Sequence, residues 1–127
     1  MREAPLRVLV VDDHRDTVDS LAMLLQSWGH EVWPTYDGPA ALAAARAHPP
    51  DVVLLDLAMP RLSGNNLAAQ LRQLPGMAEA LLVCITGLGR EEDRRRSREA
   101  GRDRHLLKPV DPEELRWVLA SGRHQAG

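Results

Sequence analysis

The sequence predicts an α/β domain in which helices cover both faces of a five-stranded parallel sheet. Short apolar runs alternate with segments of helical periodicity five times along the 127 residues. This alternation is typical of parallel strands joined by helical crossovers. The strand runs, such as Val52 to Leu55, are continuously apolar, which indicates strands buried on both faces. We therefore expect a doubly wound sheet.

The first two predicted strands flank an amphipathic helix. The first strand is expected at Leu6–Val11 and the helix at Arg15–Trp28, where apolar residues recur at helical spacing and Gly29 follows as a terminator. The second strand, Glu31–Tyr36, contains Pro34. Because proline cannot donate a hydrogen bond to a neighbouring strand, this strand is expected at an edge of the sheet.

Proline and glycine mark the limits of the next elements. Pro39 begins an alanine-rich helix that runs to about Ala47, and two prolines follow it. The third strand is expected at Asp51–Asp56. The third helix carries Leu67 and Leu71 on its apolar face, and a proline–glycine pair ends it.

The last part of the chain supplies two more strands and two more helices. The fourth strand is expected at Leu81–Thr86 and a short fifth strand at His105–Leu107. Between them, Glu91–Ala100 is helical by propensity but has almost no apolar stripe. The final helix is expected from Pro112 to about Ser121, followed by a frayed polar tail from Gly122.

The edge position of the proline-containing strand also predicts the order of the sheet. It favours the order 2-1-3-4-5, the flavodoxin-like (βα)5 arrangement, in which ligands bind outside the carboxyl ends of the strands. We expect one domain over residues 1–127, with a core from about residue 6 to residue 121.

Composition excludes several classes of protein. A net charge of −2 gives no general reason to bind DNA or an anionic membrane, and the longest apolar run has only six residues. The first residues contain no apolar stretch of signal-peptide length, so we expect a cytoplasmic location. The single cysteine, Cys84, excludes an internal disulfide and a multi-cysteine zinc site, and is expected in the core.

Polar residues follow the predicted strands at the points where the strands end. Asp12 and Asp13 follow the first strand, Asp56 ends the third, Thr86 ends the fourth, and Lys108 follows the fifth. Lys108 is the single lysine among 16 basic residues. Because the carboxyl ends of parallel strands meet at one edge, we expect these side chains to converge there.

Such a group of side chains suits a hard divalent cation. Three carboxylates repel one another, and ligands that offer only oxygen favour Mg²⁺. Three aspartates and one lysine sum to −2, so a divalent cation brings the site to zero. If Asp56 then became an acyl phosphate of about −2, the site would stand near −1 with the metal and near −3 without it. An anionic phosphoryl group is therefore expected only at the metal-loaded site.

The chain resembles the receiver domains of two-component response regulators over essentially its whole length. The motifs that carry the resemblance occur in the family's order: Asp12-Asp13, Asp56 followed by Met59-Pro60 and Gly64, Thr86-Gly87, and Lys108-Pro109. The stretch from Thr86 through Glu91-Glu92-Asp93 to Pro112 is most similar to receivers at the C-terminus of hybrid histidine kinases.

The resemblance implies a role for each motif in accepting a phosphoryl group. Asp56 would take this group from a kinase phosphohistidine or a small acyl phosphate. The Mg²⁺ ligands would be Asp13, Asp56 and the backbone carbonyl of Ala58, with Asp12 acting through metal-bound water. Lys108 would pair with the Asp56 carboxylate and later with a phosphoryl oxygen.

The family's switch residues also have counterparts. Thr86 would turn inward to the phosphoryl group, and His105 occupies the position of a common switch aromatic. The resemblance implies a cis Lys108–Pro109 peptide. The apolar Ala58 and Leu88 occupy two positions that tune water access, so we expect slow self-dephosphorylation.

The resemblance implies signalling through protein partners. The expected partners are a cognate histidine kinase or phosphotransfer protein, which contacts the first helix, and a downstream protein that reads the face formed by the fourth and fifth strands and their adjoining helices. Met23 and Trp117 are candidate contacts. We expect no enzymatic activity beyond self-catalysed phosphotransfer and slow self-dephosphorylation. We also expect no direct DNA binding and no membrane contact. The sequence leaves a monomer and a weak dimer both open.

Three alternatives remain beside a stand-alone regulator. The chain could be the C-terminal receiver of a hybrid histidine kinase, which only the full gene would separate. A pseudo-receiver that acts without phosphorylation is disfavoured because no acidic or lysine position is missing. A flavin or phosphatase domain of similar fold is disfavoured because no glycine-rich phosphate loop follows the first strand.

Overall fold

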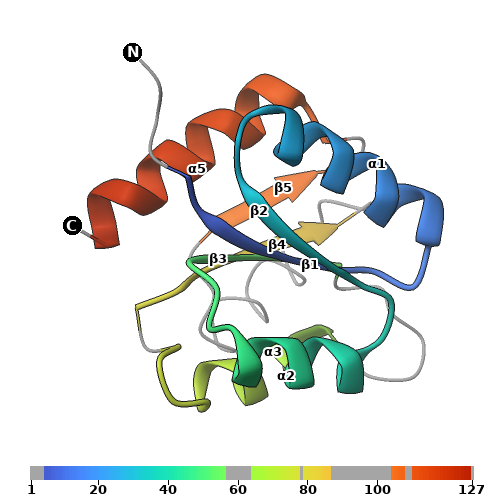
Figure 1. Ribbon diagram of the computed structural model, residues 1–127, viewed down its shortest axis with the longest axis vertical. Coiled ribbons are helices and arrows are strands. Elements are labelled where there is room, and N and C mark those ends of the chain that lie inside the picture. Colours follow the sequence, from blue (N-terminus) through green and yellow to red (C-terminus); the bar gives the residue numbers. More distant parts are fainter. Residues whose placement is uncertain (1–4, 57–63, 78, 87–103, 108–109, 127) are drawn as a thin grey trace.

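The computed structural model describes residues 5–56, 64–77, 79–86, 104–107 and 110–126 (Figure 1). Its sheet contains the strands β1 (Arg7–Val11), β2 (Glu31–Thr35), β3 (Val52–Asp56), β4 (Leu81–Thr86) and β5 (Arg104–Leu107). The described helices are α1 (Arg15–Ser27), α2 (Gly38–Ala47), α3 (Gly64–Arg72) and α5 (Pro112–Ala126).

The sheet has the predicted topology. The strand order is β2-β1-β3-β4-β5, and every neighbouring pair is parallel. β2 lies at the edge, as Pro34 requires, and Pro34 pairs in register with Val10 of β1. The fold class is thus confirmed.

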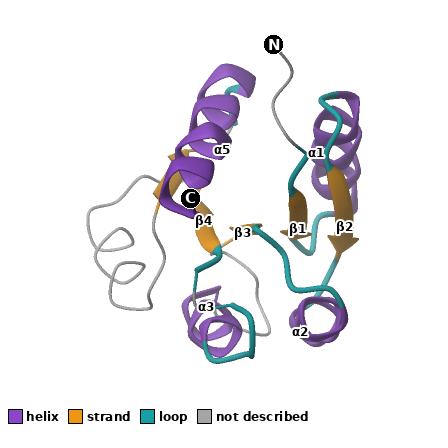
Figure 2. Cartoon of the chain, turned by 60° about the vertical axis from the view of Figure 1, so that its left-hand side comes forward, coloured by secondary structure: helices purple, strands orange, loops and turns teal. Residues whose placement is uncertain are grey.

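Helices cover both faces of the sheet, with α1 and α5 on one face and α2 and α3 on the other (Figures 1 and 2). Alternate residues of β1 enter different cores, because successive side chains of a strand point to opposite faces. Val8 and Val10 pack with residues of α1 and α5, whereas Leu9 and Val11 pack with residues of α2 and α3. This division explains why the strand sequences are continuously apolar.

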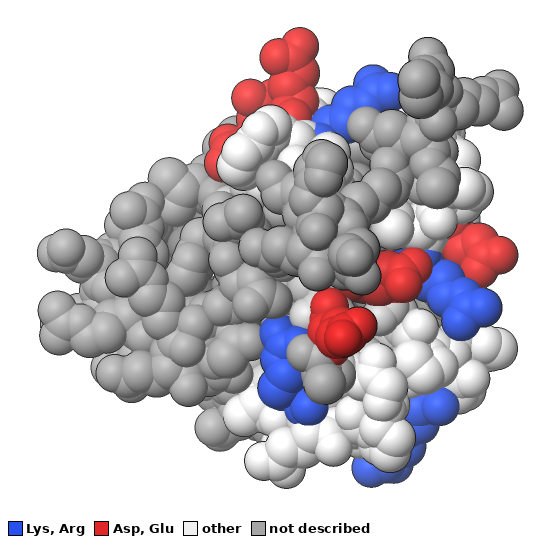
Figure 3. Space-filling model, turned by 90° about the vertical axis from the view of Figure 1, so that its left-hand side faces the viewer, with Lys and Arg blue, Asp and Glu red and all other residues white. Residues whose placement is uncertain are grey.

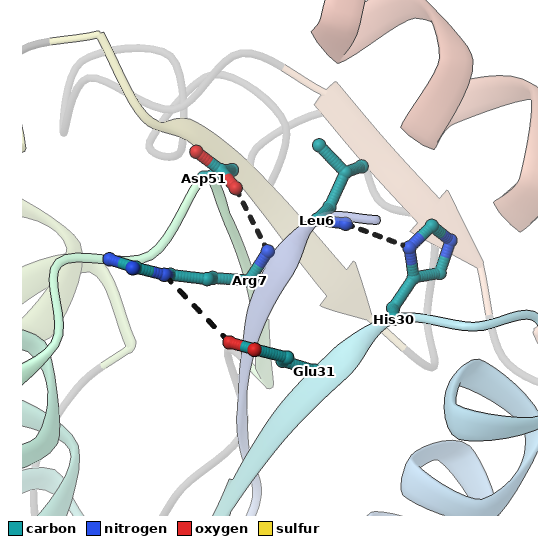
Figure 4. A network of polar contacts seen from close by, with 5 residues as sticks. All are labelled: Leu6, Arg7, His30, Glu31 and Asp51. Atoms are coloured by element: carbon teal, nitrogen blue, oxygen red, sulfur yellow. Dashed lines mark hydrogen bonds and ion pairs between the residues drawn. The ribbon is translucent and has the colours of Figure 1, made fainter. Parts of the chain in front are cut away.

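Polar contacts fix the start of β1 against both of its neighbours (Figure 4). The Leu6 N–H donates to Nδ1 of the buried His30 at 3.0 Å, and the Arg7 N–H donates to Oδ2 of Asp51 at 2.8 Å. An exposed ion pair joins Arg7 Nε to Glu31 Oε2 at 3.8 Å. On the face drawn in Figure 3, positive and negative side chains of the described residues are interspersed and neither sign forms a continuous patch.

Most elements lie within a residue or two of their predicted limits, and the last helix is the exception. α5 continues to Ala126, whereas the sequence predicted an end near Ser121 and a frayed tail. The additional turn contains arginine, glutamine and alanine, which are good helix formers, and Gly122 alone does not stop it. Gly29, by contrast, ends α1 with a φ of 92°, a conformation that favours glycine.

Two further predictions concern the apolar residues. Cys84 is fully buried, as expected of a core residue, while Met23 and Trp117 are exposed. No helix within the described ranges combines the length and the apolar character needed to cross a bilayer. The predicted helix at Glu91–Ala100 lies outside the described residues.

Candidate functional site

Three carboxylates meet at the carboxyl edge of the sheet. Asp12 and Asp13 directly follow β1, and Asp56 is the last residue of β3, the neighbouring strand. One oxygen from each carboxylate can be chosen so that all three atoms lie within 4.8 Å of one another. Asp12 and Asp56 are each only 4% exposed, and Asp13 is exposed. We call these three residues the acidic cluster.

The end of β2 and the start of α1 hold Asp12 in place. Its N–H donates to the Thr35 carbonyl at 3.3 Å, and its Oδ1 accepts from the His14 N–H at 3.0 Å. The Thr35 hydroxyl in turn donates to the Val10 carbonyl at 2.9 Å. The carboxylate is therefore oriented by the backbone of the first turn that follows its own strand.

His14 is the N-cap of α1, which the sequence did not reveal. Its Nδ1 accepts from the Thr17 N–H at 3.3 Å and lies 2.7 Å from the Thr17 hydroxyl oxygen. An Nδ1 that accepts a hydrogen bond places the imidazole proton on Nε2. Histidine is not among the common N-cap residues, and the preceding aspartates are better candidates on sequence grounds. The feature of the sequence that could have indicated this cap is Thr17, three residues after His14.

A second set of contacts joins α1 to the segment that follows β2. The Arg15 guanidinium lies 4.2 Å from the centroid of the Tyr36 ring, and the Tyr36 hydroxyl donates to Asp19 Oδ1 at 2.7 Å. This hydrogen bond to Asp19, together with burial, raises the pKa of Tyr36 above its ordinary value of 10.0, and the nearby Arg15 charge opposes the rise. Nothing in the sequence pattern predicted this contact.

A cavity of about 640 Å³ lies beside α1. Polar side chains of the first turns of α1, including Thr17 and Ser20, line part of it, and apolar side chains line the rest, among them Leu21, Ile85 of β4 and Val110. Helix α1 thus contributes both polar and apolar side chains to the lining of this cavity.

The remaining predicted site residues are described in part or not at all. Thr86 ends β4, as predicted, and pairs in register with Leu107, and His105 lies in β5. The side chains of Thr86 and His105 lie outside the described part of the chain, as do the whole of Ala58, Leu88, Lys108 and Pro109.

The donor set of the acidic cluster fits a hard divalent cation. All three side chains offer carboxylate oxygen, which is the ligand type that Mg²⁺ prefers. Two of the three carboxylates are buried, and gathering negative charge in a buried site is costly unless positive charge or hydrogen bonds compensate it. A divalent cation would supply that compensation.

Comparison with known proteins assigns the chain to a family. The model of the response regulator receiver domain matches residues 8–120. The chain belongs to this family, whose members are signalling domains of two-component systems that bind Mg²⁺ at an acidic pocket, carry the phosphoryl group on an aspartate, and interact with histidine kinases or phosphotransfer proteins.

Several relatives share more than a third of their aligned residues with the chain. A 14.6 kDa protein of Leptolyngbya boryana is 36% identical over 112 residues, which are 88% of this chain and 86% of that protein. The virulence sensor protein BvgS of Bordetella pertussis is 37% identical over 122 residues, 92% of this chain but only 10% of BvgS. The sensory transduction protein RegX3 of Mycobacterium tuberculosis is 37% identical over 119 residues, 91% of this chain and 51% of RegX3.

Solved structures agree with the fold. The chemotaxis protein CheY4 of Vibrio cholerae superposes with a TM-score of 0.88 at 29% identity, covering 93% of this chain and 98% of that one. A CheY-like receiver domain protein of Methanospirillum hungatei superposes with a TM-score of 0.87 at 26% identity, covering 96% and 97%.

Proposed function

We propose that this chain is a phosphoacceptor receiver in a two-component phosphorelay, with Asp56 as the acceptor. The observation that carries the proposal is the acidic cluster, which places the Asp56 carboxylate beside two further carboxylates at the carboxyl edge of the sheet. This edge is where parallel α/β sheets bind ligands. The proposed domain spans residues 1–127.

In the proposed reaction, an Asp56 oxygen forms a bond to phosphorus while the bond from phosphorus to the donor breaks. The leaving group is an imidazole nitrogen or an acyl oxygen, which keeps the electron pair of the broken bond. The protein contributes mainly position and charge, as is usual for phosphoryl transfer. Asp13, Asp56 and the Ala58 carbonyl would hold Mg²⁺, with Asp12 acting through water, and the bound ion would neutralise negative charge on the carboxylates and phosphoryl oxygens.

Phosphorylation of Asp56 is proposed to change the surface that the downstream protein binds. Lys108 would pair with the Asp56 carboxylate before the reaction and with a phosphoryl oxygen after it. Thr86 and His105 would carry the change to the face formed by β4, β5, α5 and the chain between the two strands. Thr86 and His105 lie on adjacent parallel strands, which supports a shared response. A cis Lys108–Pro109 peptide and slow self-dephosphorylation belong to the same proposal.

The proposed partners are a histidine kinase or phosphotransfer protein and a downstream protein target. The exposed Met23 and the cavity beside α1 support a contact of the phosphodonor protein with this helix. A cytoplasmic location follows if the phosphoryl groups originate from ATP. The alignment with a small part of BvgS supports the alternative that the chain is the receiver of a hybrid kinase.

Intact mass spectrometry after incubation with acetyl phosphate tests the proposal. Wild type, Asp56→Asn and the control Asp16→Asn, an exposed aspartate of α1 outside the acidic cluster, are compared with and without Mg²⁺. We expect wild type and Asp16→Asn to gain one phosphoryl group, only with Mg²⁺, and Asp56→Asn to gain none. Labelling of Asp56→Asn would exclude Asp56 as the acceptor.

A protein that acts without phosphorylation would give a different pattern. Wild type would stay unlabelled while a known receiver in the same tube is labelled, and calorimetric titration would detect no Mg²⁺ binding. That pair of results would favour the pseudo-receiver.

A further inference from the structure

One positive charge has a defined position on α1. Arg15 is exposed, yet its guanidinium lies over the Tyr36 ring at 4.2 Å from the centroid. A guanidinium over an aromatic face is an attractive arrangement. The ring is itself fixed, because its hydroxyl donates to Asp19 at 2.7 Å. The Arg15 side chain, which would otherwise sample many rotamers, is thus restricted by its contact with a ring that is itself held in place.

Arg15 and Tyr36 each lie close to a residue of the acidic cluster along the backbone or across a backbone hydrogen bond. Arg15 follows Asp13 by two residues, so their Cα atoms are at most about 7 Å apart. Tyr36 follows Thr35, whose carbonyl accepts the Asp12 N–H at 3.3 Å. The stack therefore lies at the rim of the cluster, well inside the Debye length of about 30 Å at 0.01 M ionic strength.

A phosphoryl donor must approach an edge that carries mainly negative charge. In the proposed site Mg²⁺ and Lys108 offset the three carboxylates of the acidic cluster, but Asp16 and Asp19 add two further negative charges on the exposed side of α1. A small acyl phosphate is dianionic and has no protein surface with which to dock. Its rate of encounter is therefore sensitive to the local field, and a fixed cation at the rim raises that rate.

We propose that Arg15, seated on the Tyr36 ring, is a guide residue that increases the rate at which small acyl phosphates reach Asp56. This inference rests on the proposed function of Asp56. Arg15 acts on the approach of the donor and is not itself a catalytic residue. The same positive charge opposes the binding of Mg²⁺, so Arg15 affects the two ligands of the site in opposite directions.

Coulomb's law sets the size of the effect. With a separation on the order of 10 Å between the guanidinium and an incoming dianion, Arg15→Gln lowers the phosphorylation rate about threefold at 0.01 M ionic strength. The charge reversal Arg15→Glu lowers it about sevenfold, and at 1 M both effects shrink to less than about 1.2-fold. Mg²⁺ affinity at low ionic strength rises by about the same threefold in Arg15→Gln.

The experiment measures the second-order rate constant with acetyl phosphate, by rapid quench and intact mass, at both ionic strengths. The donor is kept dilute so that it does not raise the ionic strength, and Mg²⁺ affinity is measured separately by calorimetry. Arg15→Lys is expected to retain most of the rate at low ionic strength. The control is Arg46→Gln, which removes the same charge from the last turn of α2, at the opposite edge of the sheet.

The two readouts separate a guiding charge from a structural contact. Slower phosphorylation together with tighter Mg²⁺ binding, both restricted to low ionic strength, would support the inference. An unchanged rate in Arg15→Gln, a loss that persists at 1 M, or weaker binding of both ligands would overturn it while Asp56 remains the acceptor. If wild type were not labelled and calorimetry detected no Mg²⁺ binding, the proposed function and this inference would fail together.

Discussion

Replacing Asp13 with asparagine should stabilise the metal-free protein. The Asp13 carboxylate lies within 4.8 Å of the two buried carboxylates of the acidic cluster. At that distance and in a water-like dielectric, each like-charge pair costs about 0.9 kcal/mol. In the proposed site, Asp13→Asn removes two such repulsions and one attraction, to Lys108. We therefore expect the free energy of unfolding to rise by about 1 kcal/mol, or about 4 °C in Tm.

Mg²⁺ should reverse the order of stability. A ligand that binds only the folded state stabilises wild type by about 2.7 kcal/mol at a concentration one hundred times its Kd. Asp13→Asn loses a metal ligand in the proposed site and gains much less. Chemical denaturation should show Asp13→Asn as the more stable protein in EDTA and wild type as the more stable protein in Mg²⁺.

The matched control is Asp16→Asn, which removes an exposed carboxylate of α1 from outside the acidic cluster. It should leave the response to Mg²⁺ intact and cost at most about 0.5 kcal/mol through the helix dipole. If Asp13→Asn lowered stability in EDTA, or if Mg²⁺ stabilised it as much as wild type, the electrostatic account of the acidic cluster would be wrong.

Two further predictions concern the surroundings of the site. Tyr36 is the single tyrosine of the chain, so ultraviolet absorbance titration reports its ionisation alone; Asp19→Asn should lower its raised pKa toward 10.0. A tyrosine whose pKa is higher in the folded than in the unfolded state stabilises the protein at pH values below the unfolded-state pKa. This stabilisation is lost as pH rises through the folded-state pKa, so Asp19→Asn should also flatten the fall in stability at alkaline pH. An unchanged titration curve would contradict the hydrogen bond from Tyr36 to Asp19. Asp37 caps α2 by accepting from the Ala40 N–H at 2.7 Å, and Asp37→Ala should cost about 1 kcal/mol in urea denaturation; a loss below about 0.3 kcal/mol would refute the cap.

The fold was predictable because its main determinants are local. Continuously apolar strands and helical periodicity indicate the layers, and Pro34 alone places β2 at the edge. The convergence of Asp12, Asp13 and Asp56 follows from the parallel arrangement, since β1 and β3 are neighbours. Sequence and elementary geometry therefore predicted both the sheet and its acidic edge.

The contacts that surround the acidic edge were not predictable in the same way. The His14 cap depends on an imidazole tautomer that has no common sequence signature. The stack of Arg15 on Tyr36 joins residues 21 positions apart, and it depends on how β2 delivers the next residue to the side of α1. The extra turn of α5 shows that the limits of a helix are less certain than its existence.

The fully buried core of the protein contains no aromatic chromophore, because the chain has no phenylalanine and neither its tryptophans nor Tyr36 are fully buried. Its three tryptophans all lie outside the fully buried positions: Trp28 packs on the rim of the core under α1 and α5, Trp33 on the rim of the core under α2 and α3, and Trp117 is exposed. Each rim tryptophan has its own neighbour, because Arg116 lies over Trp28 and His48 stacks on Trp33 at 5.1 Å. Variants that retain one tryptophan would therefore report separately on the two sides of the sheet, and their fluorescence would reveal whether the two cores open together or in turn.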